Sequence, residues 1–289
     1  MSIDSTWLRC PNCFADLSAL EERVYGCERG HRFDRSKHGY LTLLPPKAPR
    51  TLGDDRAMLA DRAALLESGA YRPIADALTD AVLPRATESE AADLRVADLG
   101  CGTGYYAGRV SQTLHDARLL LADRSPDAMR RAVRAIPDGT GVVLDLWRPL
   151  PLRDDSADVV LNVFAPRNPA EFARILRPGG RLLVVVPRAA HLHELRRRGA
   201  LLAVPPRKVT AVTEQLDSAG LVRTRSRAVE YLLSADESTR ALLIGMGPTA
   251  RHTAARRDDH GTGTMDVTVA VDVLTFVHQR AGRPEVPAA

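Results

Sequence analysis

The 289-residue sequence predicts a doubly wound α/β domain preceded by a small metal-binding ribbon. Two observations carry this prediction. From Leu94 onward, short apolar segments alternate with helical segments, which is the pattern of a mostly parallel sheet covered by helices on both faces. In addition, three of the four cysteines lie within the first 27 residues, and a histidine follows the third of them.

The composition excludes several classes of protein. Hydrophobic residues make up 45% of the chain and charged residues 26%, a balance that supports a packed core and excludes a disordered chain. Four cysteines are too few for a disulfide-stabilised scaffold. No run of 18 apolar residues predicts a transmembrane helix, and residues 1–9 lack the features of a signal peptide. We therefore expect a cytoplasmic protein with reduced thiols and no membrane partner.

The positive charge is unevenly distributed. The formal net charge is +4, and all but three of the 40 basic residues are arginine. A GC-rich genome explains most of this preference, although arginine also suits phosphate contacts through its planar fork of donors. Residues 188–227 contain nine basic and three acidic side chains, so this segment alone carries a charge of +6. Such a segment predicts a polyanionic partner.

The cysteine cluster has the spacing of a zinc site. Cys10 and Cys13 form a Cys-x2-Cys pair, and Cys27 and His31 form a Cys-x3-His pair. Four protein ligands leave no open coordination position, so we expect a structural Zn²⁺ and not a catalytic one. A segment of this size cannot bury a core of its own, so metal binding would drive its folding. The alternative is a chance cluster of buried thiols.

Two helices are expected between the ribbon and the α/β domain. Asp54 is a good N-cap for a helix over residues 55–68, which Gly69 ends. A second helix follows Pro73 and ends at Pro84, and an acidic loop follows it. The expected organisation is a zinc-binding ribbon (1–46), a linker with helices (47–93), the α/β domain (94–280) and a tail (281–289).

The α/β domain begins with five strands that are expected to be parallel. Helices are expected after Gly104, after Ser125 and over residues 169–176. Toward the end of the chain, two helices (from 209 to 219 and from 235 to 245) alternate with two long strands that are expected to close the sheet in antiparallel fashion. The predicted strands are 94–99, 119–123, 141–145, 158–163, 181–186, 221–233 and 264–277.

The loop after the first of these strands is rich in glycine. Residues 102–107 formally match a dinucleotide-binding pattern, with Asp123 at the end of the next strand, but a single match of this kind is weak. Two acidic residues favour S-adenosylmethionine instead. Asp98 precedes the loop, where a carboxylate would repel a pyrophosphate but attract an ammonium group, and Asp145 is placed to accept a hydrogen bond from an adenine amino group.

Together with a Pro-Gly-Gly turn at residues 178–180, these motifs resemble the class I S-adenosylmethionine-dependent methyltransferase family over residues 96–187. The resemblance implies a Rossmann-like, mostly parallel seven-stranded sheet. It also implies that Asp123 holds the ribose hydroxyls and that Cys101 is a loop residue beside the cofactor. The cofactor loop is Gly100-Cys101-Gly102-Thr103-Gly104.

The ribbon and this domain together resemble a narrower family, the zinc-containing 23S rRNA (guanine-N1)-methyltransferases. The resemblance spans nearly the whole chain, and the run Asn162-Val163-Phe164-Ala165-Pro166 is most similar to the macrolide (tylosin) resistance branch. The other motifs that carry it are Gly39-Tyr40, Gly53-Asp54, Gly69-x-Tyr71-x-Pro73, His191-Leu192-x-Glu194-Leu195 and Met246-x-Pro248.

This resemblance implies specific roles and partners. The zinc ligands of the family fall on Cys10, Cys13, Cys27 and His31, and its cofactor contacts fall on Tyr71, Gly102, Thr103 and His191. The family forms homodimers, and its substrate is a guanine in a domain II hairpin of 23S rRNA, where a methyl group hinders macrolide binding. Without the resemblance, Tyr71 is interpreted as a core aromatic residue and His191 as a histidine at the start of a helix.

The sequence leaves the catalytic group open among a few candidates. Guanine N1 carries a proton at neutral pH, which must leave as the methyl group arrives, and a general base would contribute typically 10²–10⁴-fold. Asn162, at the end of the fourth strand, and the carboxylate of Asp54 are the catalytic candidates, with the imidazole of His191 as a further one.

Two other functions remain open at this point. The first is a small-molecule methyltransferase of antibiotic biosynthesis with an accessory zinc ribbon, which leaves the basic segment unexplained. The second is a non-enzymatic zinc protein that binds nucleic acid. It would require a broken cofactor site, but Asp98, the loop glycines and Asp123 are all present.

Overall fold

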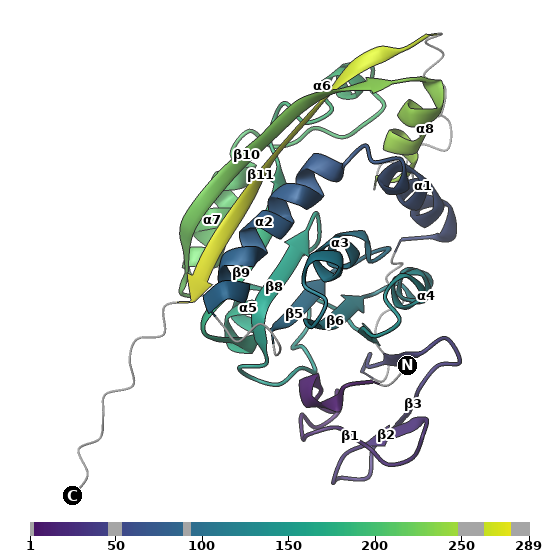
Figure 1. The fold of residues 1–289 in the computed structure, drawn as a ribbon, viewed down its shortest axis with the longest axis vertical. Helices are drawn as coiled ribbons and strands as arrows, with labels where there is room; N and C mark the ends of the chain where they lie inside the picture. The colour runs from purple at the N-terminus through teal and green to yellow at the C-terminus, as the bar shows by residue number, and fades with distance from the viewer. Residues whose placement is uncertain (1–2, 46–53, 89–93, 248–262, 279–289) are drawn as a thin grey trace, which may run out of the picture.

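One eight-stranded sheet forms the centre of the molecule (Figure 1). The structure is a computed structural model and describes residues 3–45, 54–88, 94–247 and 263–278. The strand order is β10-β11-β9-β8-β5-β6-β7-β4. The strands are β4 (Tyr40–Thr42), β5 (Arg95–Leu99), β6 (Arg118–Asp123), β7 (Thr140–Val143), β8 (Ala157–Val163), β9 (Leu176–Pro187), β10 (Leu221–Ala235) and β11 (Met265–His278).

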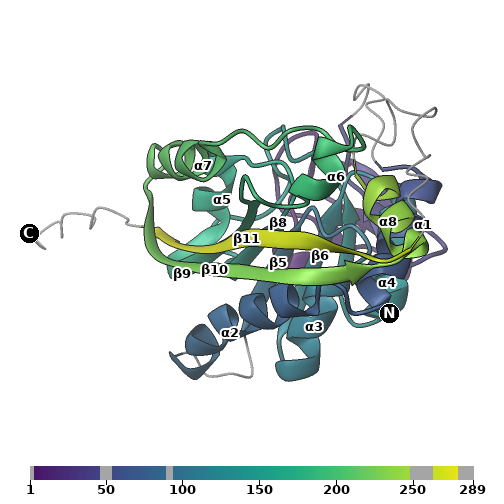
Figure 2. The same cartoon turned by 90° about the horizontal axis from the view of Figure 1, so that it is seen from above.

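The strands from β4 to β9 pair in parallel, and β10 and β11 close the sheet in antiparallel fashion, as predicted. Helices cover both faces of the sheet (Figure 2). One face carries α2 (Arg72–Glu88), α3 (Tyr105–Thr113) and α4 (Pro126–Ala135), and the other carries α5 (Pro169–Ile175) and α7 (Lys208–Asp217). Three further helices, α1 (Arg56–Glu67), α6 (His193–Arg197) and α8 (Glu237–Gly245), lie toward the carboxyl ends of the parallel strands (Figure 1).

Alternating side chains of the central strands feed two apolar layers. In β5, Val96 belongs to the layer under α2, α3 and α4, whereas Ala97 and Leu99 belong to the opposite layer. Every residue of β5 is buried, because helices cover both faces of a parallel sheet. The predicted doubly wound, mostly parallel sheet is therefore confirmed.

The N-terminal ribbon is docked against the lower part of this sheet (Figure 1). It comprises a short 3-10 helix (Ser5–Trp7) and a three-stranded antiparallel sheet of β1 (Ser18–Ala19), β2 (Val24–Gly26) and β3 (Arg32–Asp34). Trp7 is fully buried in the same apolar cluster as residues of β6 and β8, and the guanidinium of Arg95 stacks 4.0 Å from the centre of its ring. The ribbon thus shares a core with the α/β domain.

Two expectations of local structure were wrong. The sheet has eight strands and not seven, because β4 aligns its backbone with residues 141–143 of β7 and extends the sheet edge. Helix α1 is capped by Asp55, whose side chain accepts from the Met58 N–H at 2.9 Å, and not by Asp54, whose carboxylate pairs with Arg62 instead.

The predicted end of the second helix at Pro84 was also wrong, because α2 continues through Pro84 to Glu88. The predicted acidic loop after this helix and the predicted tail (281–289) fall almost entirely outside the described residues. Among the helices that are described, none combines the length and apolar character that a membrane crossing requires.

Candidate functional site

The four predicted metal ligands come together in the ribbon. Their ligand atoms all lie within 4.8 Å of one another. Cys10 Sγ and His31 Nδ1 are 3.6 Å apart, Cys27 Sγ and His31 Nδ1 3.4 Å, and Cys13 Sγ and Cys27 Sγ 3.6 Å. Zinc–sulfur bonds of about 2.3 Å and zinc–nitrogen bonds of about 2.0 Å place tetrahedral ligands at about these separations. The cluster therefore fits a structural Zn²⁺ with no open position.

Two tight turns hold the ligands in place. The Cys10 carbonyl accepts from the Phe14 N–H at 2.8 Å, which folds the first pair of cysteines into one turn. The Cys27 carbonyl accepts from the Gly30 N–H at 3.0 Å, and the Cys27 N–H donates to the His31 carbonyl at 3.1 Å. Each turn thus converts short sequence spacing into short spatial distance within its own pair of ligands.

The second site surrounds the glycine loop between β5 and α3. Gly100 has φ +89°, and a Cβ at this position would lie 2.3 Å from the Cβ of Ala165. Gly104 has φ +81° and leads directly into α3. Only glycine satisfies both the left-handed conformation and the close approach. The loop therefore passes tightly beneath the segment that follows β8.

Asp98 lies at the floor of this loop. Its side chain is 1% exposed, and neither carboxylate oxygen has a hydrogen-bond partner of ordinary geometry within the described residues. Burial and the nearby negative charge of Asp123 raise the pKa of Asp98 to about 7, and the backbone N–H of Ala107 opposes only part of this shift. A buried carboxylate in this state is costly, so its position is suited to a cationic group of a ligand. The ammonium group of S-adenosylmethionine fits this requirement.

Asp123 closes β6 on the other side of the loop. Its carboxylate accepts from the backbone N–H of Gly102 at 2.9 Å and of Ser125 at 2.8 Å. These bonds orient both oxygens, while burial raises the pKa of Asp123. The carboxylate keeps acceptor capacity for the hydroxyl donors of a ribose.

Asp145 follows β7 and is already engaged within the chain. It forms ion pairs with Arg124 and Arg148 and accepts from the Trp147 N–H at 3.1 Å. Trp147 is 70% exposed beside it. The predicted contact from Asp145 to adenine therefore stays a prediction.

Sequence reasoning missed Arg62. This side chain extends from α1 to the glycine loop, where a Cβ on Gly102 would lie 3.4 Å from Arg62 Nη1. Its guanidinium pairs with the carboxylate of Asp54 and donates to the Met246 carbonyl at 2.9 Å. No local pattern marks Arg62, because an arginine on a charged helix is typical of a solvated face.

Tyr71, Phe164 and His191 form an aromatic cluster. The rings of Phe164 and His191 stack with centroids 6.0 Å apart, and Tyr71 lies 6.1 Å from His191 and 6.3 Å from Phe164. Phe164 is 42% exposed, and its φ of +52° is unusual for a residue other than glycine. Backbone strain of this kind is concentrated at functional sites.

The hydrogen bonds of His191 define its protonation. Its Nδ1 accepts from the Ala270 N–H at 3.2 Å, so in the neutral ring Nε2 carries the proton and faces the Tyr71 hydroxyl at 3.4 Å. Burial, followed by the positive charges of Arg196 and Lys208, lowers the pKa of His191 to about 4. Because both ring nitrogens are engaged, His191 is better suited to positioning Tyr71 than to accepting a proton.

Asn162 and Asp54 contact different parts of the site. The Asn162 amide donates to the carbonyls of Leu99 at 3.1 Å and Pro166 at 2.9 Å, which ties the end of β5 to the segment after β8. Its Oδ1 is buried with no partner in the described part of the chain. Asp54 lies instead beside Arg62, and its carbonyl accepts from the Ser125 hydroxyl at 3.0 Å.

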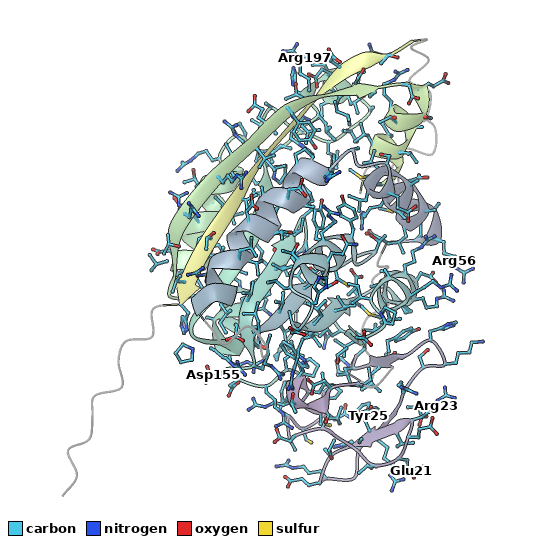
Figure 3. The ribbon with its side chains drawn as sticks, in the orientation of Figure 1. Glu21, Arg23, Tyr25, Arg56, Asp155 and Arg197 are labelled. Carbon is cyan, nitrogen blue, oxygen red and sulfur yellow. The ribbon has the colours of Figure 1, made fainter. Side chains whose placement is uncertain are left out.

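The basic segment 188–227 does not form a single patch. Arg197 lies on α6 near the top of the molecule in Figure 3, whereas residues 223–227 lie at the opposite end of β10. Several of its charges are also neutralised, since Arg188 pairs with Glu230 at 2.6 Å and Arg227 pairs with Asp80 at 2.8 Å. Charge counted along the sequence therefore overstated the local positive surface.

Comparison with known proteins adds two family matches and several relatives. Residues 8–51 match the model described as RlmA, N-terminal, and residues 96–180 match a methyltransferase domain. The chain is 42% identical over 274 residues to a 23S rRNA (guanine(748)-N(1))-methyltransferase of Streptomyces fradiae, which covers 92% of this chain and 94% of the relative. A Micromonospora griseorubida protein that is provisionally named a 23S rRNA (guanine-N(1)-)-methyltransferase is 40% identical, over 86% of this chain and 88% of its own length.

Methyltransferases of small or carrier-bound substrates match a much shorter part of the chain. A malonyl-[acyl-carrier protein] O-methyltransferase of Methylococcus capsulatus is 36% identical over 111 residues, which is 35% of this chain. The similarity to the rRNA enzymes therefore extends well beyond the shared domain.

Proposed function

Because the chain belongs to the family of 23S rRNA (guanine-N1)-methyltransferases with an N-terminal zinc ribbon, we propose that it transfers a methyl group from S-adenosylmethionine to N1 of one guanine in 23S rRNA. The name of the S. fradiae relative specifies guanine 748, and we propose the equivalent guanine, in a domain II hairpin, as the target here. The observation that carries the proposal is the match over 92% of the chain, which includes the ribbon.

We propose that the cofactor binds across the glycine loop. The carboxylate of Asp98 would hold its ammonium group and Asp123 its ribose, with the backbone of Gly100, Gly102, Thr103 and Gly104 close to it. Tyr71 and His191 would line the side opposite Asp123, and Asp145 would lie toward the adenine. When bound, S-adenosylmethionine supplies an electrophilic methyl carbon on a positively charged sulfur.

The aromatic cluster offers a surface for the target base. Phe164 presents a partly exposed ring that His191 and Tyr71 hold from behind. A guanine that leaves its stack to reach a buried site regains energy by stacking on an aromatic side chain, about 1–3 kcal/mol per base. We propose that Phe164 receives the guanine and that Asn162 holds the Phe164 segment against the loop.

The transfer itself needs a proton acceptor. The N1 lone pair forms a bond to the methyl carbon while the carbon–sulfur bond breaks and its electron pair stays on sulfur, and the proton of N1 must leave. We propose Asp54 as the carboxylate that takes this proton. An Asp54→Asn variant would then lose about 10²–10⁴-fold in kcat. If Asp54 only held Arg62 in position, the same substitution would instead change KM for the cofactor.

The direct test uses purified protein, labelled S-adenosylmethionine and naked 23S rRNA or an isolated domain II hairpin. Label is expected in RNA with wild-type protein and is not expected when the target guanosine is replaced by adenosine. Label confined to small metabolites would favour the alternative, a small-molecule methyltransferase with an accessory ribbon.

Three further properties are part of the proposal. The product would confer resistance to tylosin-type macrolides, which a susceptibility assay on an expressing strain measures. The protein would act in the cytoplasm, where ribosomes are assembled. It would also be a homodimer, which is supported by the long edge strand β10, whose residues 223–228 are exposed. Light scattering on the purified protein measures this last property.

A further inference from the structure

Arg167 differs from most arginines of the described chain because it has no acidic partner there. It lies in the segment between β8 and α5, and its Nη1 donates to the Ala165 carbonyl at 3.3 Å. Its Nε is buried and has no partner within the described residues. Partial burial lowers the pKa of Arg167, and no neighbouring carboxylate in the described ranges opposes this shift.

Lys208, the first residue of α7, is a second cation at the same place. It forms no ion pair within the part of the chain that the structure describes, and its side chain is partly buried. Burial, followed by the positive charge of Arg167, lowers the pKa of Lys208. The ammonium of Lys208 also acts on His191, which stacks on Phe164. Lys208 is therefore near enough to Arg167 and to His191 to interact with both electrostatically.

Two other partly buried arginines of the described chain are neutralised by carboxylates. Arg174 is held by Asp154 and Glu171, and Arg177 donates to Asp158 at 3.0 Å. Two partly buried cations without a carboxylate between them repel each other and lose hydration. An anion from outside the chain would relieve this repulsion.

The position of the pair identifies the anion. Arg167 is three residues from Phe164 along a segment that the Asn162 amide fixes at Pro166. A nucleotide whose base stacks on Phe164 carries its negative charge on the phosphodiester that links it to the next nucleotide. Resting on the RNA substrate proposed above, we propose that Arg167 and Lys208 together bind one backbone phosphate of the RNA next to the target guanine.

Charge-removing variants of the full-length, zinc-loaded enzyme test this proposal. Arg167→Gln and Lys208→Gln are each expected to raise KM for the hairpin about tenfold, as for loss of a charge-assisted hydrogen bond. Each is expected to reduce the slope of log affinity against log salt by about one. The affinity for S-adenosylmethionine should not change. Arg167→Lys should restore most of the binding, because it keeps the charge.

Arg207→Gln is the matched control. Arg207 immediately precedes Lys208, its side chain is 83% exposed, and its distance to Glu214 is 3.9 Å. This variant removes the same charge from the same turn, and its KM and salt slope are expected to stay near those of the wild type.

A second measurement needs no variant. Replacing the phosphate next to the target guanosine by a neutral methylphosphonate should raise KM for wild-type enzyme, and Arg167→Gln should add little to that loss. Unchanged KM and salt slope in both variants would overturn the proposal, as would equal losses in Arg207→Gln. If Arg167→Gln and Lys208→Gln weakened the binding of S-adenosylmethionine and not that of RNA, the two cations would bind the cofactor carboxylate, which would also overturn the proposal. Wild-type enzyme that methylates no RNA would contradict the proposed function and not this site alone.

Discussion

The residues that form the zinc site are close together in the sequence, whereas those around the glycine loop are far apart in it. All four zinc ligands fall between residues 10 and 31, and a local turn closes each of the two ligand pairs. The groups around the glycine loop come from α1, from the ends of β5, β6 and β8, and from His191 before α6. A site built from one short segment can be predicted from sequence spacing, whereas a site built by the sheet is defined only when the sheet is assembled.

The two regions also depend on each other, and loss of zinc tests how strongly. Cys13→Ser is expected to remove one metal ion per chain and to destabilise the α/β domain as well, because Trp7 and Leu8 of the ribbon are buried in the core that lies under the sheet. Structural zinc in small domains contributes apparent binding energies of about 10–16 kcal/mol. Of the substitutions proposed in this Discussion, we therefore expect Cys13→Ser to cause the largest loss in the free energy of unfolding.

Metal analysis together with a thermal unfolding curve checks this prediction. Glu28→Gln, an exposed change on the same ribbon, is the control and should leave both unchanged. If the cysteine variant kept its metal, or lost it with no change in the unfolding of the α/β domain, the shared core would not couple the two regions.

Among the residues proposed to bind the cofactor, Asp98 is expected to contribute most. Asp98→Asn is expected to weaken S-adenosylmethionine binding by about 2–5 kcal/mol, since it removes one partner of a buried charge pair. Without cofactor, the same change should stabilise the protein at pH 8, because it removes a buried ionised carboxylate that no cation among the described residues neutralises. Calorimetric titration measures the affinity for S-adenosylmethionine, and thermal unfolding without ligand measures the stability. Weaker binding together with lower stability would instead indicate a structural role for Asp98.

The pH dependence of cofactor binding follows from the same group. The pKa of Asp98 is about 7 in the free protein, above its ordinary value of 3.8, so the side chain is increasingly protonated below pH 7. A cationic ligand requires the ionised form, and its dissociation constant should therefore rise up to about tenfold per unit as pH falls from 7 toward 4. Above pH 7 this contribution should be flat. Titrations at several pH values measure the dissociation constant for wild type and for Asp98→Asn. An equal slope against pH in the two proteins would exclude Asp98 as the source of the pH dependence.

The stability of the free protein should change in the opposite direction. Because the pKa of Asp98 is higher folded than unfolded, the folded state binds more protons between pH 4 and pH 7. The contribution of this group to stability is complete at low pH and is lost as pH rises through about 7.

Arg62 is expected to give the smallest of these effects. Arg62→Gln removes its ion pair with Asp54, which is partly exposed, and such a pair contributes about 1 kcal/mol or less. We expect a modest rise in KM for S-adenosylmethionine with little change in thermal stability. Arg56→Gln, on the same helix with a side chain 77% exposed, is the control. Identical kinetics in the two variants would show that Arg62 does not act on the glycine loop.

Much of this molecule was predictable because its signals are local. Short apolar runs located the strands of the sheet, the Cys/His spacing located the ligands of the metal cluster, and Gly100 and Gly104 marked a loop that only glycine can form. Motif resemblance added Tyr71 and His191, which the structure brings together at 3.4 Å.

The remaining features depend on distant partners. Asp54 was expected to cap the first long helix, but Arg62, eight residues away, engages its carboxylate and Asp55 is the cap. β4 joins the large sheet only because the docked ribbon brings it beside β7. The isolation of Arg167 from acidic groups of the described chain and the pairing of Arg188 with Glu230 could not be counted from the sequence, since charge balance along a chain does not give charge balance in space.

One measurement tests the central claim most directly. Full-length protein is incubated with S-adenosylmethionine and unmodified 23S rRNA, and primer extension across domain II is compared for wild type and Asp98→Asn. We predict a strong stop at a single guanine with the wild type, identified as N1-methylguanosine after digestion of the RNA, and no stop with the variant. Absence of the stop in RNA treated with cofactor-bound, zinc-loaded wild-type protein would contradict guanine-N1 methylation of 23S rRNA as its function.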